Sequence, residues 1–136
     1  MSILIDTQVF LWAVGMQKKL SSGALELLED PGQPIFFSAA SAWEIMIKYA
    51  KGRLDLPATP AEIIFSVVST AGLSQLSISM KDALAVSDLP LHHNDPFDRL
   101  LVAQARNNGL RLMTADPILE KYDVDVIALW LDEDDE

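Results

Sequence analysis

Short apolar runs alternate with helix-like segments along the whole sequence, and this alternation limits the possible folds more than any other feature. The clearest runs are 2–6, 35–38, 110–116 and 124–129, and a weaker run covers 73–79. Strands that are separated by helices usually form parallel sheets. The pattern therefore predicts an α/β fold with three α/β/α layers and a central, mainly parallel sheet of four to five strands.

The expected helices have clear start and stop signals. They comprise 7–15, 21–30, 39–52, 59–72, 80–90, 96–108 and a helical turn at 117–122. Asp95 can cap the helix that opens with Pro96, and Gly109 follows its end. Within 39–52 an apolar stripe at helical spacing comprises Ala42, Ile45, Met46, Tyr49 and Ala50. Trp12 and Trp43 lie within apolar helical stripes, so both are expected in the core.

Composition narrows the class of protein. The chain has 136 residues, of which 50% are hydrophobic, and this suffices for one domain with a full core. It has no cysteine, so disulfides and thiol catalysis are excluded. We expect residues 1–131 to form the domain and the acidic segment 132–136 to be a disordered tail. A basic leader and an apolar run of about 18 residues are both missing, which favours a cytoplasmic protein without membrane contact.

The net charge is −10 at pH 7, and the five acidic residues of 132–136 supply half of it. The remainder of the chain is still mildly acidic, which argues against broad, non-specific binding to nucleic acid. It leaves room for a small basic strip beside an acidic, metal-filled site.

Four acidic residues are expected at one edge of the sheet. Asp6 ends the first strand, and Asp116 ends the run 110–116. Glu44 lies in the first turns of the helix after 35–38, and Asp98 lies in the first turn of its helix. Because parallel strands end at the edge where the following helices begin, these carboxylates should lie close together.

Crowded carboxylates need a physical explanation. Two of them about 5 Å apart repel by roughly 3 kcal/mol at an effective dielectric constant of about 20. They must therefore lie farther apart, take up protons or surround a cation. Oxygen ligands suit Mg²⁺ or Mn²⁺, whereas two adjacent histidines without cysteine do not indicate a structural zinc site.

Each acidic residue also has an ordinary structural interpretation. Asp116 precedes a proline and can cap the turn that follows. Glu44 can complete a capping box with Ser41, and Asp6 competes with Thr7 to cap the first helix. A single acid explained in this way would mean little, but four at one edge indicate a site.

The motifs taken together resemble the PIN-domain ribonucleases, and in particular the VapC-type toxins of bacterial toxin–antitoxin pairs. The resemblance extends from residue 2 to about residue 130. It rests on four segments in the family's order, LIDTQVFLW, SAASAWEIMIKYAKGRL, HHNDPFDRLLVAQA and LMTAD. It implies a PIN-like (Rossmann-like) fold and a Mg²⁺- or Mn²⁺-dependent endoribonuclease that cleaves RNA with a metal-activated water. The acidic cluster that it implies is Asp6, Glu44, Asp98 and Asp116.

Within that cluster, Asp6 and Asp98 are the first choice as metal ligands. Glu44 is expected to bind the metal or to hold a metal-bound water, and Asp116 to be a ligand or to support one. Thr7 and Thr114 are candidates to orient these acids, with capping or strand packing as the alternative.

Several further residues have two interpretations. Asp95 is expected to be the N-cap that positions Asp98. The candidate phosphate contacts, which are equally typical of solvated helix faces, are Arg99, Lys48, Lys51 and Arg53. His92 and His93 are expected in a loop or packing role rather than on RNA. The resemblance also implies a homodimer and a cognate antitoxin whose tail covers the acids. Its groove on the early helices would be lined by Phe10, Leu11 or Trp12.

Other classes of protein fit less well. A phosphotransfer receiver needs paired acids after the first strand, and a phosphatase of the haloacid type needs a second aspartate two residues after the first; only Asp6 is present there. A metal-dependent nuclease acting on DNA or flap structures is disfavoured by the small size. The main alternative is a catalytically silent PIN-like module that binds protein or RNA.

Overall fold

The computed structural model describes residues 1–129, which contain a five-stranded sheet in the order β3-β2-β1-β4-β5, with every neighbouring pair parallel. The strands are β1 (Ile3–Ile5), β2 (Ile35–Ser38), β3 (Ser74–Leu76), β4 (Arg111–Thr114) and β5 (Val126–Ala128). The expected α/β class and parallel sheet are thus confirmed, and 73–79 does contain the fifth strand.

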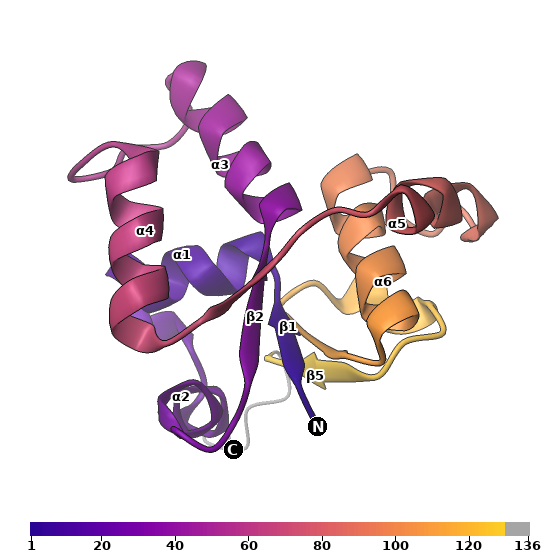
Figure 1. The fold of residues 1–136 in the computed structure, drawn as a ribbon, viewed down its shortest axis with the longest axis horizontal. Helices are drawn as coiled ribbons and strands as arrows, with labels where there is room; N and C mark the ends of the chain where they lie inside the picture. The colour runs from indigo at the N-terminus through magenta and orange to yellow at the C-terminus, as the bar shows by residue number, and fades with distance from the viewer. Residues whose placement is uncertain (130–136) are drawn as a thin grey trace.

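Helices cover both faces of this sheet. They are α1 (Thr7–Gly15), α2 (Ser22–Glu29), α3 (Ala39–Ala50), α4 (Pro60–Ala71), α5 (Met80–Ala85) and α6 (Pro96–Asn108). Short 3₁₀ turns occupy Gln17–Lys19, Val86–Asp88 and Pro117–Lys121. Figure 1 shows α1 to α4 on one side of β1 and β2, and α5 with α6 on the other. This arrangement is the expected three-layer architecture.

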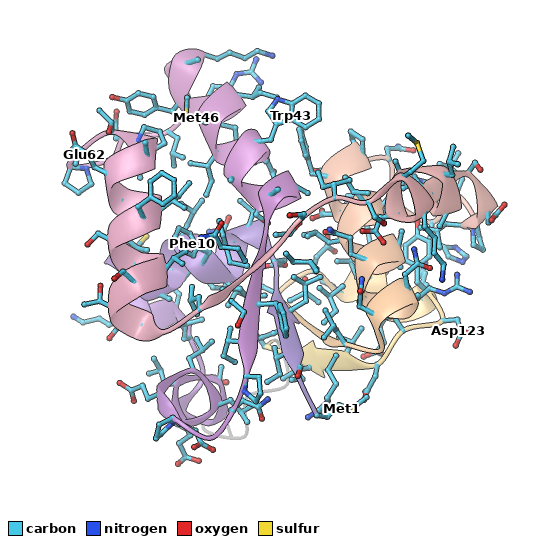
Figure 2. The ribbon with its side chains drawn as sticks, viewed as in Figure 1. Met1, Phe10, Trp43, Met46, Glu62 and Asp123 are labelled. Atoms are coloured by element: carbon cyan, nitrogen blue, oxygen red, sulfur yellow. The ribbon has the colours of Figure 1, made fainter. Side chains whose placement is uncertain are left out.

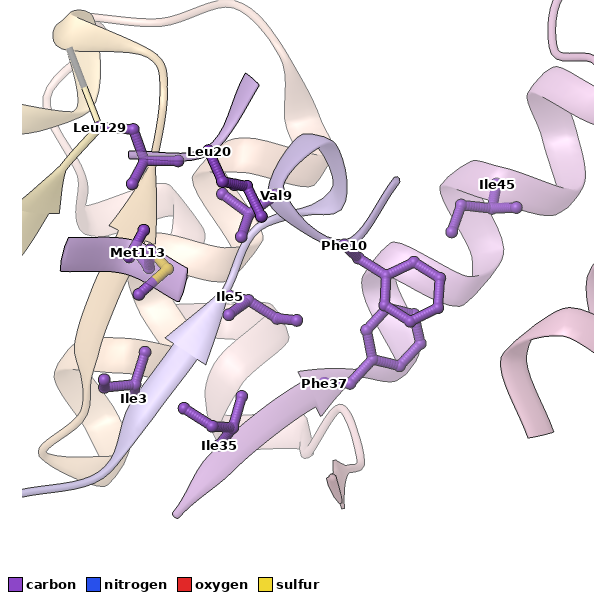
Figure 3. Close-up of a cluster of buried hydrophobic side chains, with 11 residues drawn as sticks. Ile3, Ile5, Val9, Phe10, Leu20, Ile35, Phe37, Ile45, Met113 and Leu129 are labelled. Atoms are coloured by element: carbon purple, nitrogen blue, oxygen red, sulfur yellow. The ribbon is translucent and has the colours of Figure 1, made fainter. Parts of the chain in front are cut away.

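Alternation along β1 divides the interior into two cores. Ile3 and Ile5 face the first core, whereas Leu4 faces the second. The buried residues of the first core (Figure 3) are Ile3, Ile5, Val9, Phe10, Leu20, Ala24, Ile35, Phe37, Ile45, Met113 and Leu129. Those of the second are Leu4, Ala40, Leu89, Leu101, Val102, Ala103, Ala105, Leu110, Leu112, Leu119 and Tyr122. Both faces of β1 are therefore buried, and all three of its residues are apolar, whereas Ser74 and Gln75 of the edge strand β3 are exposed.

Capping side chains fix the helix boundaries as expected. Asp95 is the N-cap of α6, and its Oδ1 accepts a 2.8 Å hydrogen bond from the Phe97 N–H. Pro96, between these two residues, is the first residue of the helix. Gly109 ends α6 with a φ of 63°, in the left-handed region that glycine adopts without strain. These boundaries matter because they place the first turn of α6, and with it Asp98, at the carboxyl edge of the sheet.

The predicted core position of Trp43 is wrong. Its side chain is 58% exposed and projects from α3 toward α6 (Figure 2), where its ring meets the edge of Phe97. The apolar stripe predicted for α3 is also wrong at Met46, Tyr49 and Ala50, which are all exposed. The buried residues of α3 are Ala40, Ser41, Glu44 and Ile45, so the buried face of the helix includes two polar residues that the predicted stripe left out. Trp12 is partly buried against the first core, in closer agreement with the prediction.

Two further expectations concern the acidic C-terminal segment and the absence of a membrane-spanning helix. The acidic segment 132–136, predicted to be a disordered tail, lies outside the described residues. Among residues 1–129, every helix is too short or too polar to cross a membrane.

Candidate active site

A pocket of about 430 Å³ lies where β1 and β4 end and where α3 and α6 come together. Its lining comprises Asp6, Thr7, Gln8, Leu11, Trp12, Glu44, Lys48, Asp95, Asp98, Ala115, Asp116 and Pro117. All four acidic residues predicted to meet are in this lining. Their roles as metal ligands or catalytic groups remain predictions.

Asp6 leaves the end of β1 and caps α1. Its Oδ1 accepts a 2.8 Å hydrogen bond from the Val9 N–H, so Asp6 and not Thr7 is the N-cap. Burial raises the pKa of Asp6 to about 6, and the negative charge of Glu44 adds to the shift. Hydrogen bonds from Thr114 and Val9 oppose it. Asp6 is therefore a buried carboxyl that loses its proton near neutral pH.

Glu44 is held on both of its oxygens. The Thr7 hydroxyl donates a 2.6 Å hydrogen bond to Oε1, and Lys48 Nζ forms an ion pair with Oε2 at 2.7 Å. Ser41 Oγ lies 2.9 Å from the same Thr7 hydroxyl. The capping box suggested for Ser41 and Glu44 is wrong, because Ser38 is the N-cap of α3 and both residues lie inside the helix. Thr7, the first residue of α1, thus hydrogen-bonds the predicted site residue Glu44.

Asp98 lies in the first turn of α6, directly after its cap. Asp95 Oδ1 accepts a hydrogen bond from the Asp98 N–H at 3.4 Å as well as the one from Phe97. Burial, together with repulsion from Asp95, Asp6 and Glu44, raises the pKa of Asp98 to about 7. The capping interpretation and the cluster interpretation of this segment are therefore compatible: Asp95 builds the helix start, and Asp98 faces the other acids.

Asp116 follows β4 and forms hydrogen bonds with a residue on either side of it in the sequence. Its Oδ1 accepts a 3.0 Å hydrogen bond from the Ile118 N–H, so it caps the 3₁₀ turn as predicted. Thr114 Oγ1 accepts a hydrogen bond from the Asp116 N–H at 3.0 Å. Thr114 also hydrogen-bonds Asp6, so this buried threonine joins two of the acids.

His93 is the residue that the sequence reasoning undervalued. Its Nε2 lies 2.7 Å from Asp116 Oδ2 and 3.3 Å from Asp98 Oδ2. Side-chain atoms of these three residues that can bind metal all lie within 4.8 Å of one another. The available signal was the position of His93, two residues before the Asp95 cap, but nothing in the pattern showed where its ring would point.

The predicted phosphate contacts separate into two groups. Lys48 is the cation in the pocket lining. The Arg99 guanidinium instead donates hydrogen bonds to the carbonyls of Val86, Leu89 and Pro90, outside that lining. It thereby secures the segment that follows α5. Lys51 and Arg53 are exposed after the end of α3 and do not line the pocket.

The donor set fits a hard divalent cation. The pocket offers carboxylate oxygens from four separate segments. Oxygen ligands of this kind suit Mg²⁺ and Mn²⁺. The raised pKa values of Asp6 and Asp98 reflect burial and mutual repulsion, and a cation among these carboxylates would relieve both.

Fold and pocket together define an α/β/α domain with an acidic cluster at the carboxyl edge of its sheet. The PIN domain family model matches residues 3–125, and the chain belongs to this family. Among curated proteins, none matches the sequence.

Several solved structures have the same fold as this chain. VapBC2 from Rickettsia felis, bound to a promoter DNA fragment, has a TM-score of 0.72 and 16% identity, with 94% of this chain and 98% of that chain covered. A toxin–antitoxin complex from Klebsiella pneumoniae has a TM-score of 0.65 and 17% identity, with coverage of 93% and 97%. DNA-bound VapBC from Salmonella typhimurium has a TM-score of 0.66 and 13% identity, with coverage of 95% and 98%. At these identities the likeness shows the fold.

Proposed function

We propose that this protein is a Mg²⁺- or Mn²⁺-dependent endoribonuclease and the toxin of a VapBC-type toxin–antitoxin pair. The observation that carries the proposal is the convergence of Asp6, Glu44, Asp98 and Asp116 on one pocket. Membership of the PIN domain family supports a nuclease. The carboxylate cluster supports the same activity, because it can hold the divalent metal that such hydrolysis of phosphodiesters uses.

Asp6 and Asp98 would hold the cation, with Glu44 and Asp116 as further ligands or as acceptors for water in its shell. When bound, the metal would lower the pKa of a water molecule and stabilise the departing oxygen of the phosphodiester. The protein supplies the fixed carboxylates. Its hydrogen bonds from Thr7 to Glu44 and from Val9 to Asp6 hold two of them in place before any substrate arrives.

Lys48 is our candidate for the contact with the RNA backbone. It is half-exposed in the pocket lining and carries the positive charge there, since the other ionisable lining residues are acids. The hydrogen bond and ion pair with Glu44, with smaller contributions from the charges of Asp95 and Asp98, raise the pKa of Lys48, so the ammonium stays charged. A phosphate would meet this charge at the rim of an otherwise negative pocket.

The protein partner is proposed from the solved structures of similar fold, one of which is described as a toxin–antitoxin complex and two as VapBC proteins bound to DNA. Leu11 and Trp12 lie in the lining beside the acids, where an antitoxin tail covering the pocket would contact them. Phe10, which was also considered for this groove, is instead buried in the first core. We also propose a homodimer and a cytoplasmic location, as for a toxin of this class.

The direct test is cleavage of total cellular RNA by the purified protein with Mn²⁺ and with a chelator. Asp98→Asn removes a pocket carboxylate, and Asp123→Asn removes an exposed one that does not line the pocket. We expect discrete fragments with the wild type and with Asp123→Asn, in Mn²⁺ only, and intact RNA with Asp98→Asn. Cleavage that survives Asp98→Asn would contradict the assignment of the site. Intact RNA with folded wild type that binds Mn²⁺ would favour the catalytically silent module.

A further inference from the structure

The His93 ring is held at both of its nitrogens. The Asp95 N–H donates a 2.9 Å hydrogen bond to Nδ1, and Nε2 lies 2.7 Å from Asp116 Oδ2. The main chain of the same residue is also fixed, because its N–H donates to the Tyr122 hydroxyl at 3.0 Å. The imidazole is only 17% exposed. Its orientation is therefore determined by the fold and not by solvent.

These contacts assign the ring tautomer. A nitrogen that accepts a hydrogen bond from a main-chain N–H carries no proton, so the proton of the neutral ring lies on Nε2. The ring then donates its Nε2–H to Asp116, with Asp98 Oδ2 at 3.3 Å from the same nitrogen. A protonated nitrogen has no lone pair to offer a metal. His93 is therefore a hydrogen-bond donor to the carboxylates and not a ligand.

We propose that His93 is a positioning residue, whose Nε2–H holds the Asp116 carboxylate beside Asp98 and preorganises this pair for a divalent cation. The inference rests on the metal site of the proposed function and deepens it. Asp98 belongs to α6 and Asp116 follows β4, so the imidazole joins two separate elements of the fold. The two carboxylates repel each other, and the ring proton supplies the positive end of a dipole facing both.

The placement of Asp116 depends on this contact. Its side chain is 32% exposed, whereas that of Asp98 is 19% exposed. Its Oδ1 is engaged by the Ile118 N–H, and Oδ2 by His93. Without the imidazole, Oδ2 would be free to turn toward solvent, and the side chain would no longer be held at Asp98. A merely structural role of His93 would change stability but would leave the metal affinity as it is.

Two substitutions of His93 distinguish the role of Nδ1 from the role of Nε2. His93→Asn places an acceptor near the position of Nδ1 and removes the donor toward Asp116. His93→Gln places an amide N–H near the position of Nε2 and removes the acceptor for Asp95. His92→Asn is the matched control, because the neighbouring ring is exposed and packs on the edge of the Tyr122 ring.

The experiment measures Mn²⁺ affinity by calorimetry, together with the melting temperature of each variant in chelator. We expect His93→Asn to weaken Mn²⁺ binding about tenfold or more. His93→Gln and His92→Asn should stay within about threefold of the wild type. Equal affinity of His93→Asn and wild type would overturn the proposal. An equal loss in the Asn and Gln variants would also overturn it, because the Nε2–H would then not be the decisive group.

A second readout is independent of the metal. The ¹⁵N spectrum of the histidine rings in the metal-free protein should show His93 with its proton on Nε2, and Asp116→Asn should shift these signals while Asp123→Asn should not. A ring proton on Nδ1, or signals unaffected by Asp116→Asn, would contradict the contact. If the wild type binds no Mn²⁺, the proposed function fails, while the ring spectrum still decides whether His93 holds Asp116.

Discussion

The Thr7 hydroxyl donates a 2.6 Å hydrogen bond to Glu44 Oε1 across 37 positions of sequence. This contact joins α1, which follows β1, to α3, which follows β2. Lys48 holds the other oxygen of the same carboxylate at 2.7 Å. Glu44 therefore has a fixed orientation although it is buried among other acids, and Thr7 is the neutral group responsible for part of that orientation.

Thr7→Val keeps the shape of the side chain but removes the hydroxyl. We expect a loss of about 1–3 kcal/mol in the free energy of unfolding, because a buried carboxylate oxygen loses its donor. Cleavage activity should fall further than stability explains. Thr7→Ser, which retains the donor, should stay close to the wild type in both urea denaturation and cleavage. If Thr7→Val and Thr7→Ser behaved alike, the hydroxyl would have no role in holding Glu44.

The metal-free protein should lose stability as the pH rises from about 4 to 7. The pKa values of Asp6 and Asp98 are raised to about 6 and about 7, so between pH 4 and 7 the folded state binds more protons than the unfolded state. Stability falls with pH wherever the folded state binds more protons, and raising both pKa values from 3.8 corresponds to an upper limit of roughly 7 kcal/mol, at about 1.4 kcal/mol for each pKa unit. Urea denaturation in chelator between pH 4 and 8 measures the slope.

Asp98→Asn should flatten this pH dependence and should make the metal-free protein more stable than the wild type at pH 8. Asp123→Asn, which removes an exposed charge, should leave the slope unchanged. A wild-type stability that is flat or rises across this interval in chelator would show that the pocket carboxylates are not under mutual repulsion.

Lys48→Met should weaken RNA binding and reduce its dependence on salt. Each phosphate contact contributes about one unit to the slope of log affinity against log salt concentration. Lys51→Met is the matched control, since Lys51 lies three residues farther along, outside the pocket. Binding of a short RNA by the Asp98→Asn variant, which should not cleave, measures the slope. Equal slopes for the two lysine variants would assign the phosphate contact elsewhere.

A buried polar link positions α3 against α6. Ser38, the N-cap of α3, donates a 2.5 Å hydrogen bond to Gln104 Oε1 in α6, and Gln104 Nε2 donates to the Ser77 carbonyl at 3.2 Å. Gln104 is fully buried. Gln104→Met should therefore cost about 1–3 kcal/mol of unfolding free energy. The exposed Gln17→Met should change it by less than about 0.5 kcal/mol. Comparable losses in both variants would mean that the link stabilises nothing.

The sequence predicted those features that depend on neighbouring residues. Apolar runs located the strands, and the Asp95 cap with Pro96 located the start of α6, because strand formation and capping are local. The meeting of Asp6, Glu44, Asp98 and Asp116 also followed, since it needs only parallel strands and the helices after them. The strand order predicts that these acids lie at the carboxyl edge of the sheet, but it predicts none of their hydrogen bonds.

The remaining features depend on contacts between distant segments. Glu44 and Ser41 are buried because Thr7 of α1 contacts them, and this contact places Trp43 on the outside of α3. The His93 ring points into the site because Tyr122 and the Asp95 N–H hold its loop. These side chains are polar or amphipathic, so hydrophobic periodicity carries no information about their partners.

Calorimetric titration of the metal-free protein with Mn²⁺ at pH 7.5 tests most directly whether the pocket carboxylates hold a divalent cation. We predict saturable binding by the wild type, with release of a fraction of a proton, because Asp98, whose pKa is raised to about 7, is still partly protonated at this pH. Asp98→Asn should weaken this binding at least tenfold, and Asp123→Asn should not. No binding by a folded wild type, or equal affinity in wild type and Asp98→Asn, would contradict the account.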